Sequence, residues 1–375
     1  IPDDFYNSLN DSEGYIYATD EDGDLIASAA LSNNATFDLK AFYDIKNKSY
    51  DITHVFKYES NGVTNYSIYT FPKASYGHYT REKHVAYPEK TAIVRIENTG
   101  NNPEIKGLLS GGGTRSSNGN GGWIEVEYDL EQIPDNRYLS IRGGGDTDWK
   151  YIWLEDVYEN DQDTLQYNAL PVLALANSTT VNLPSNDNLF YEIIGFTSRE
   201  SSKRHLITDI SENQGASSVV QNIPSGLFSM FERRVILVDA DKYYTTMERN
   251  SSVSNSYSLP NLDYEILDTS VANFEMTSNS AYDYYDIYFR RVNQDYKIRW
   301  FFKGKGESTV NVRFPNLVNE IFAEHPNFVI SDLSLYGESI TNSEGLEKFE
   351  DFVGSWFESV YGKLLTKEES FSKNL

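Results

Sequence analysis

Aromatic and acidic side chains are concentrated between residues 123 and 163. Two tryptophans and a tyrosine alternate along 149–153, so they share one face of a predicted strand, and a tryptophan and two glutamates alternate along 123–127. Aromatic rings stack on the C–H faces of sugars, and carboxylates accept hydrogen bonds from hydroxyls. The candidate ligand-binding residues are therefore Trp123, Glu125, Glu127, Trp149, Tyr151 and Trp153. The alternative is that these rings form a core or pack on a neighbouring domain, which is the commoner fate of tryptophan.

Carboxylates surround these aromatic residues. Hard oxygen ligands of this kind bind Ca²⁺, so the candidate metal ligands are Asp146, Asp148, Asp161 and Asp163. With Glu155 and Asp156, the same group could also supply the two carboxylates that glycoside cleavage requires. The sequence indicates no catalytic residue that is more specific than this. No sequence feature requires a cofactor, and Ca²⁺ is the one candidate for a bound metal ion.

Other motifs in the chain favour structural roles. The acidic run 20–24 resembles a calcium loop, but Leu25 and Leu31 occupy the positions that an EF-hand gives to glycine and to the bidentate glutamate. A hairpin turn exposed to solvent fits this run better. The glycine triplets 111–113 and 143–145 lack the Lys-Ser/Thr ending of a phosphate-binding loop. No Gly-x-Ser-x-Gly motif is present, so a serine hydrolase of the common α/β type has no support.

Charge and composition exclude several classes of function. The 375-residue chain has 56 acidic and 32 basic residues and a formal net charge of −24, which disfavours binding to nucleic acid or to anionic lipid. The absence of cysteine excludes thiolate catalysis and cysteine-ligated metals. A secreted eukaryotic protein of this size would usually carry disulfides, so we expect an exported bacterial protein.

The ends and hydropathy of the chain bear on its location. The sequence begins at Ile1 without a methionine, which is consistent with removal of an N-terminal segment through which a lipoprotein could be anchored. No apolar run approaches the roughly 20 residues that span a bilayer, so no transmembrane segment is predicted. We therefore expect an extracellular or cell-surface location.

Period-two alternation dominates the sequence and predicts a mainly β protein of two or three sandwich-like domains. Strands are expected in a hairpin at 14–28 and at 35–43, 49–58, 63–71, 91–97, 123–130, 190–196, 234–239, 282–292, 296–303 and 308–314. Tyr282, Tyr284, Asp286 and Tyr288 share one face of a strand that should be buried on both sides or covered by a C-terminal helix. The predicted domains are 1–90, 91–183 and 184–375, with a linker at 178–188.

Helices are expected only near the C-terminus. A capping box formed by Thr341 and Glu344 precedes an apolar stripe that predicts an amphipathic helix over 343–365. A shorter helix is expected over 317–324, before Pro326.

The first 90 residues resemble a known family. The run from Gly14 to Ala29, with its Asp/Gly turn between two strands, is similar to the opening hairpin of carboxypeptidase-regulatory-like domains, and the runs 37–39 and 50–53 fall where that family has its next strands. The resemblance implies a small transthyretin-like β-sandwich, usually an accessory module of exported bacterial proteins. It implies no functional residues.

These observations favour a non-catalytic extracellular or cell-surface protein that acts in recognition or assembly. A glycan is the most plausible ligand, and another surface protein is an alternative partner. One alternative function is an enzyme that acts on polysaccharides with a carboxylate pair. Another is a structural adhesin or pilus-type subunit that pairs its sheet edges with like subunits. An exposed aromatic ladder would favour the recognition protein. Two close carboxylates in a cleft would favour the enzyme, and a long uncovered edge strand would favour the structural subunit.

Overall fold

A computed structural model of the chain describes residues 13–32, 49–74, 90–106, 114–119, 122–130, 133–173, 177–199, 203–345, 349, 351–353 and 365–373. Strands account for 58% and helices for 5% of the structure, which confirms the prediction of a mainly β protein. The chain divides into two compact units. The first comprises residues 1–84, 241–243 and 260–375, and the second comprises residues 85–240 and 244–259. The second unit therefore runs across residue 183, where the sequence predicted a domain boundary.

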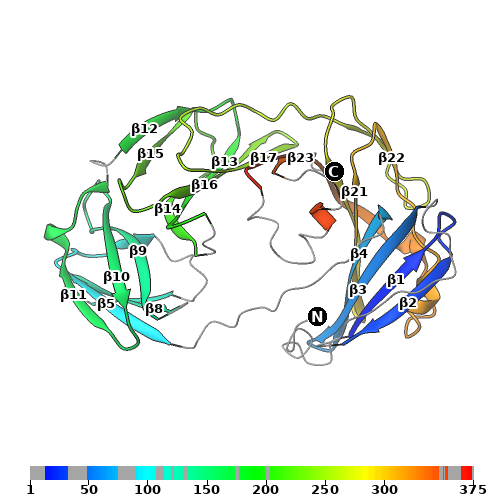
Figure 1. Ribbon diagram of the computed structural model, residues 1–375, viewed down its shortest axis with the longest axis horizontal. Helices are drawn as coiled ribbons and strands as arrows, with labels where there is room; N and C mark the ends of the chain where they lie inside the picture. The colour runs from blue at the N-terminus through cyan, green and yellow to red at the C-terminus, as the bar shows by residue number, and fades with distance from the viewer. Residues whose placement is uncertain are drawn as a thin grey trace. The chain divides into compact units, whose positions relative to one another are not determined.

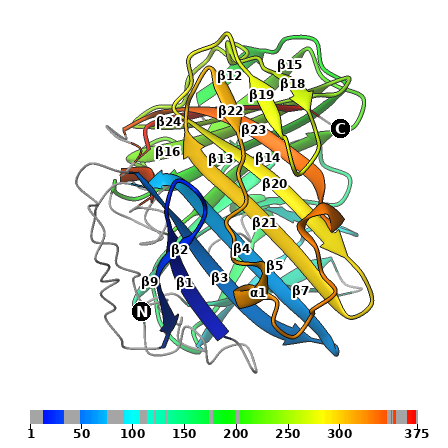
Figure 2. The ribbon, with the colours of Figure 1, turned by 90° about the vertical axis from the view of Figure 1, so that its right-hand side faces the viewer.

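The first unit is built on one large sheet (Figure 2). Eight strands lie side by side in the order β24-β23-β20-β21-β4-β3-β1-β2, and all neighbouring pairs are antiparallel except β21 and β4, which are parallel. The elements of this unit are β1 (Glu13–Thr19), β2 (Leu25–Leu31), β3 (Tyr50–Ser60), β4 (Val63–Ala74), β18 (Glu265–Asp268), β19 (Glu275–Thr277), β20 (Tyr284–Val292), β21 (Tyr296–Lys305), β22 (Thr309–Asn311), α1 (Val318–Ile321), the 3₁₀ turn η3 (Ile330–Asp332), β23 (Ser334–Glu344) and β24 (Lys367–Lys373).

One face of this sheet forms the core of the first unit. Trp300 and Phe302 on β21 and Phe289 on β20 point to this face and have no exposed surface. Phe314, from the segment after β22, lies across all three, with ring centroids 5.0, 4.8 and 5.1 Å from theirs. Phe322, which follows α1, packs edge-on against Tyr66 of β4 at 4.9 Å. The alternation along β20, β21 and β4 thus places one set of aromatic residues in the core and the other set on the opposite face.

The predicted hairpin at 14–28 is present as β1 and β2. Asp20 accepts hydrogen bonds from the backbone N–H groups of Asp22 and Asp24, both at 2.9 Å, and Gly23 adopts φ +80°. This φ favours glycine, because a Cβ would be strained there. The backbone N–H of Asn316 donates to the carbonyl oxygen of Gly23 at 2.9 Å, so the turn docks on the segment after β22. The acidic run is therefore explained by turn formation.

The second unit contains several smaller sheets (Figure 1). Their strand orders are β11-β5-β8-β7, β10-β9-β6, β12-β15 and β14-β13-β16-β17. The elements are β5 (Thr91–Glu97), β6 (Glu104–Lys106), β7 (Thr114–Gly119), β8 (Trp123–Asp129), β9 (Asp135–Arg142), β10 (Lys150–Val157), β11 (Gln162–Gln166), the 3₁₀ turn η1 (Tyr167–Ala169), β12 (Asn177–Asn182), β13 (Asn188–Phe196), β14 (His205–Glu212), β15 (Ser218–Ile223), β16 (Met230–Asp239) and β17 (Lys242–Asn250), which belongs to this unit from Tyr244 onward.

The β10-β9-β6 sheet is covered on both faces. Ile152 and Leu139 pack on one side with the apolar face of β8, which contains Ile124, Val126 and Tyr128 as the sequence predicted. On the other side, Tyr138 of β9 belongs to a second core with residues of β12, β13, β15 and β16. Strand β9 is therefore buried on both faces, and its two buried charged residues, Asp135 and Arg137, form an ion pair at 3.3 Å.

Two predictions about elements are corrected. Thr341 and Glu344 do not cap a helix, because both lie in β23, and residues from Lys367 onward form β24. Between β23 and β24, residues 349 and 351–353 are helical, and residues 346–348, 350 and 354–364 lie outside the described part of the chain. The short predicted helix is present as α1. Residues 177–182 form β12 and are not part of a linker. The expected strand at 35–43 and the glycine triplet 111–113 also lie outside the described residues.

The glycine triplet at 143–145 forms a close contact within the second unit. A Cβ on Gly144 would lie 1.5 Å from the carbonyl oxygen of Asn101. The N–H of Gly143 donates to the hydroxyl of Tyr167 at 2.8 Å. Close approach of backbone therefore accounts for these glycines. No helix among the described residues combines the length and the apolar character that crossing a membrane requires.

Candidate functional site

The aromatic residues of β10 face the second core of their unit. Trp153 packs edge-on against Phe228 at 5.7 Å and against His205 at 5.3 Å, and its indole N–H donates to Glu155 at 2.9 Å. Burial lowers the pKa of His205 to about 3, so this ring is neutral at pH 7. Tyr151 stacks on Tyr138 at 6.2 Å. This arrangement is the packing alternative that the sequence left open, and ligand binding by these rings stays a prediction.

The six predicted ligand-binding residues do not converge on one surface. Trp123, Glu125 and Glu127 lie on β8 opposite its buried face, while Tyr151 and Trp153 lie on β10 opposite Ile152. Because both buried faces share one core, the two sets point away from each other. The ring centre of Trp123 lies 4.2 Å from the guanidinium carbon of Arg95, and the ring centre of Trp149 lies 5.2 Å from the guanidinium carbon of Arg142.

We expect Trp153→Ala to destabilise the second unit by about 2–3 kcal/mol, less than for a fully buried tryptophan because the ring is only partly buried. The loss should appear as a lower melting temperature in calorimetry. An unchanged melting temperature with loss of binding on a glycan array would contradict this expectation and would mean that the ring contacts a ligand.

The predicted metal ligands do not form a cluster among the described residues, where no group of three or more His, Asp or Glu side chains could hold an ion. Asp161 instead accepts a hydrogen bond from the N–H of Tyr158 at 2.7 Å. Asp163 lies in β11, with its backbone paired to Val94 in β5. Asp146 and Asp148 lie in the loop before β10. Binding of Ca²⁺ by these residues stays a prediction.

The large sheet of the first unit carries a row of aromatic side chains on the face opposite its core. Tyr288 of β20 is directly opposite Phe301 of β21, which is in turn beside Tyr69 of β4. The ring centroids are 4.4 and 5.0 Å apart, and both pairs are within 10° of parallel. These separations match the distance between neighbouring strands, so the rings stand side by side. Tyr336 of β23 extends the row, 5.1 Å from Tyr288 and inclined to it at 75°.

A β-bulge places Tyr336 at the end of this row. The register of β20 and β23 shifts after Tyr288, so that Gly337 and Leu335 have partners in β20 and Tyr336 is the extra residue. Bulges of this kind redirect a side chain and often occur beside functional sites. Among the described residues, no atom lies within 4 Å of the position of a Cβ on Gly337, and 51% of Tyr336 is exposed. We call Tyr69, Phe301, Tyr288 and Tyr336 the ring row.

Two arginines lie beside the ring row. Arg290 and Arg299 are directly opposite each other on β20 and β21. Each is two residues from its neighbour in the ring row, Tyr288 or Phe301, and so lies on the same face of the sheet. The Arg290 guanidinium lies 3.4 Å from the ring centre of Tyr336, and Arg299 is exposed. Neither arginine forms an ion pair within the part of the chain that the structure describes. Burial raises the pKa of Tyr288, and the positive charges of Arg299 and Arg290 oppose this rise.

The other side of the ring row is closed by contacts within the unit. Lys303 forms an ion pair with Asp286, which neutralises both charges. Beyond them, Tyr284 stacks on Phe352 at 4.3 Å, and Phe352 and Val353 form a buried cluster with Phe71. A helical turn that contains Phe352 and Val353 therefore covers this end of the face. The row is open toward the arginines.

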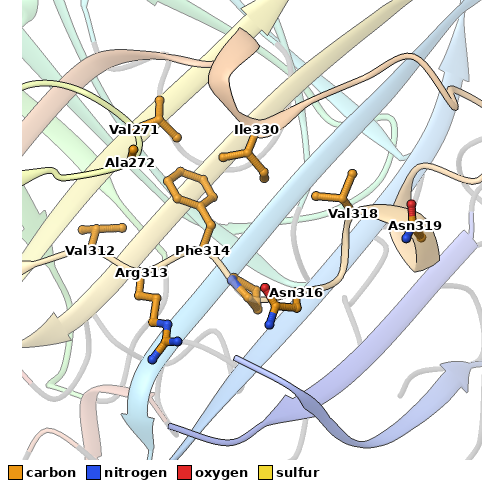
Figure 3. A pocket seen from close by; sticks show the side chains of 10 residues that line it. Val271, Ala272, Val312, Arg313, Phe314, Asn316, Val318, Asn319 and Ile330 are labelled. Carbon is orange, nitrogen blue, oxygen red and sulfur yellow. The ribbon is translucent and has the colours of Figure 1, made fainter. Parts of the chain in front are cut away.

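A cavity of about 450 Å³ lies on the core side of the first unit (Figure 3). Phe314, Val312 and Ile330 supply apolar parts of its wall, and Arg313, Asn316 and Asn319 supply polar parts. Two of its three polar side chains have structural partners: the side chain of Asn316 donates to Asp24 at 2.8 Å, and the guanidinium of Arg313 donates to the carbonyl oxygen of Glu21. These two groups hold the β1–β2 turn in place.

A pair of buried carboxylates is present in the second unit. Glu192 of β13 and Glu232 of β16 are each 4% exposed, and one nitrogen of Arg204 lies 3.6 and 4.0 Å from their oxygens. Burial raises the pKa of Glu192, although Arg234 and Arg204 oppose the rise. Arg234 also pairs with Glu232 at 2.5 Å. Both carboxylates therefore belong to a charge network, which explains their burial without a catalytic role.

Sequence reasoning missed most of the ring row. It identified Tyr284 and Tyr288 as one face of a strand but assigned that face to the core. A further signal was present in β21, where Lys297, Arg299, Phe301, Lys303 and Lys305 alternate with apolar residues. Alternation of this kind indicates a face that is not fully buried, because lysine and arginine are almost never buried without a partner. No known protein family matches the chain, and no curated protein matches it in sequence.

Proposed function

We propose that this chain is a non-catalytic, extracellular or cell-surface recognition protein whose first unit binds a polysaccharide along the ring row. The observation that carries the proposal is the exposed end of the row, where Tyr336, Tyr288 and Arg290 are in mutual contact on an otherwise regular sheet face. Tyrosine and arginine are the residues most often found at the centre of binding surfaces.

The chemistry of the row suits a hydrated ligand. Each tyrosine combines an apolar ring with a hydroxyl that both donates and accepts a hydrogen bond, and each arginine adds several donors. Sugars combine C–H groups with hydroxyls in the same way. Because stacked rings occupy one another's faces, a ligand meets mainly ring edges, hydroxyl groups and guanidinium groups. Rings held side by side are also rigid, so little side-chain entropy is lost on binding.

The alternative functions find less support. An enzyme that uses a carboxylate pair would require groups free to exchange protons, whereas Glu192 and Glu232 are bound to arginines. An assembly protein would require an open edge strand. Strand β2 is at an edge of the large sheet and has seven residues, which favours this function only weakly.

We expect Tyr336→Ala to weaken binding to the recognised polysaccharide about tenfold, which corresponds to about 1.4 kcal/mol. Because the side chain is half exposed, the melting temperature should stay within a few degrees. Affinity electrophoresis against a panel of neutral and acidic polysaccharides measures this effect. Tyr158→Ala is a matched control, since Tyr158 is also 51% exposed but belongs to the second unit.

Two results would contradict the proposal. One is that the protein binds no polysaccharide of the panel. The other is that Tyr336→Ala and Tyr158→Ala bind as the unaltered protein does, in which case the ring row is not the binding surface.

A further inference from the structure

We infer that the ligand of the ring row is an acidic polysaccharide, one that carries a carboxylate on its repeating sugar. The inference rests on the proposed function and specifies its ligand. The observation behind it is the direct opposition of Arg290 and Arg299 on neighbouring strands. Like charges in this position repel each other and destabilise a sheet. In the described part of the chain, no carboxylate within 4 Å compensates for either of them.

Some charged residues of this sheet have a carboxylate partner, whereas Lys297 and Lys305, which share the face of Arg299 on β21, have no ion pair among the described residues either. Lys303, on the same face of β21, pairs with Asp286, and Arg291, on the opposite face of β20, pairs with Asp332 at 2.8 Å. Lys57 of β3 is within 4.0 Å of two glutamates. In a chain with a net charge of −24, acidic partners are abundant. What distinguishes Arg290 and Arg299 is that they are directly opposite each other without an ion pair among the described residues, and Lys297 next to them on the same face adds a further positive charge.

The ring row strengthens the attraction for an anion. An aromatic ring carries partial positive charge at its edge and partial negative charge on its face. Tyr288, Phe301 and Tyr69 cover one another's faces, so their edges point away from the sheet. Hydroxyl donors and ring edges thus lie beside two guanidinium groups. A guanidinium binds a carboxylate through two parallel hydrogen bonds.

The overall acidity of the chain does not oppose this inference at short range. Charges in solvent are screened over about 8 Å at physiological ionic strength, so the potential at the ring row depends on its immediate neighbours. The row also crosses four strands, β4, β21, β20 and β23, with the arginines along one side. A linear polymer lying along the rings would present its carboxylates repeatedly to that side.

The test compares polygalacturonate with its methyl ester, which is the same polymer without the negative charge. We expect the protein to bind polygalacturonate at least tenfold more tightly than the ester, and NaCl at about 500 mM to remove most of this preference. Arg299→Ala should abolish the preference, while Arg299→Lys should retain part of it. Arg142→Ala, which removes an arginine paired with Glu104 in the second unit, should bind as the unaltered protein does.

The outcomes separate this inference from the proposed function. Equal binding to the acid and the ester that still depends on Tyr336 would overturn the acidic ligand and leave polysaccharide binding intact. Absence of binding to every polysaccharide would overturn both. Equally tight binding to polyglutamate or single-stranded DNA would show a general affinity for polyanions and would overturn the assignment to a sugar polymer.

Discussion

We expect Trp300→Ala to lower the free energy of unfolding of the first unit by about 3–5 kcal/mol, the largest loss of any single substitution considered for this chain. Trp300 has no exposed surface and lies on β21, between β20 and β4. The centroid of its ring lies 6.0 Å from that of Phe302, 5.0 Å from that of Phe314 and 6.3 Å from that of Phe322. Removing the indole would leave a cavity among aromatic rings that cannot collapse without moving several strands.

A polar contact adds to this cost. The indole N–H of Trp300 donates to the hydroxyl of Thr70 at 2.9 Å, and Thr70 is 3.0 Å from the hydroxyl of Thr53. Trp300→Phe keeps most of the apolar volume but removes the donor, so it should cost only about 1–2 kcal/mol. Urea denaturation followed by far-ultraviolet circular dichroism measures both variants. A loss below about 1 kcal/mol for Trp300→Ala would show that the ring is not part of the core.

The alternation of residue types predicted the class of fold and many of the strands. The hairpin around Asp20, the apolar face of β8 and the positions of β20 and β21 follow from local patterns, because a strand exposes alternate residues to each face. The same local reasoning failed at 341–344, where a sequence typical of a helix start is part of β23. Pairing with β20 on one side and β24 on the other outweighs the weak helical preference of these residues.

The ring row could not be predicted from local patterns. It depends on the parallel pairing that brings Tyr69 beside Phe301, 232 positions later in the chain, and on the bulge that places Tyr336 next to Tyr288. A single sequence contains no signal for either register. For the aromatic strand around Trp153, the alternation correctly predicts which residues share a face. The layer that covers this face comes from β13 and β16, and no local pattern in the sequence indicates that these strands pack on it.

A buried acid in the first unit makes the stability of the protein depend on pH. Glu338 of β23 is 4% exposed on the core side of the sheet. The hydroxyl of Tyr264 donates to its Oε1 atom at 2.7 Å, and the backbone N–H of Lys373 donates to that hydroxyl at 2.9 Å. The Oε2 atom is buried and has no hydrogen-bond partner among the described residues. Burial raises the pKa of Glu338 to about 7, and the hydrogen bond from Tyr264 opposes this rise.

The raised pKa means that the folded state binds this proton more tightly than the unfolded state. Below pH of about 4.5 the carboxyl is protonated in both states, and the full stability is present. As the pH rises from about 4.5 to about 7, the unfolded state ionises first, so stability falls. Above pH 7 both states are ionised and the loss is complete. At about 1.4 kcal/mol for each pH unit, the loss amounts to about 3.5 kcal/mol.

We therefore expect Glu338→Gln to remove this loss. The amide oxygen can still accept the hydrogen bond from Tyr264, and the side chain cannot ionise. The variant should match the unaltered protein near pH 4.5 and exceed its free energy of unfolding by about 3.5 kcal/mol at pH 8. Denaturation by urea across this range measures the difference. Glu344→Gln, at the exposed end of the same strand, should follow the unaltered protein at every pH. Parallel pH profiles for Glu338→Gln and the unaltered protein would contradict this expectation. They would show that Glu338 is ionised in the folded state across the whole pH range, and that other contacts offset the cost of burying its charge.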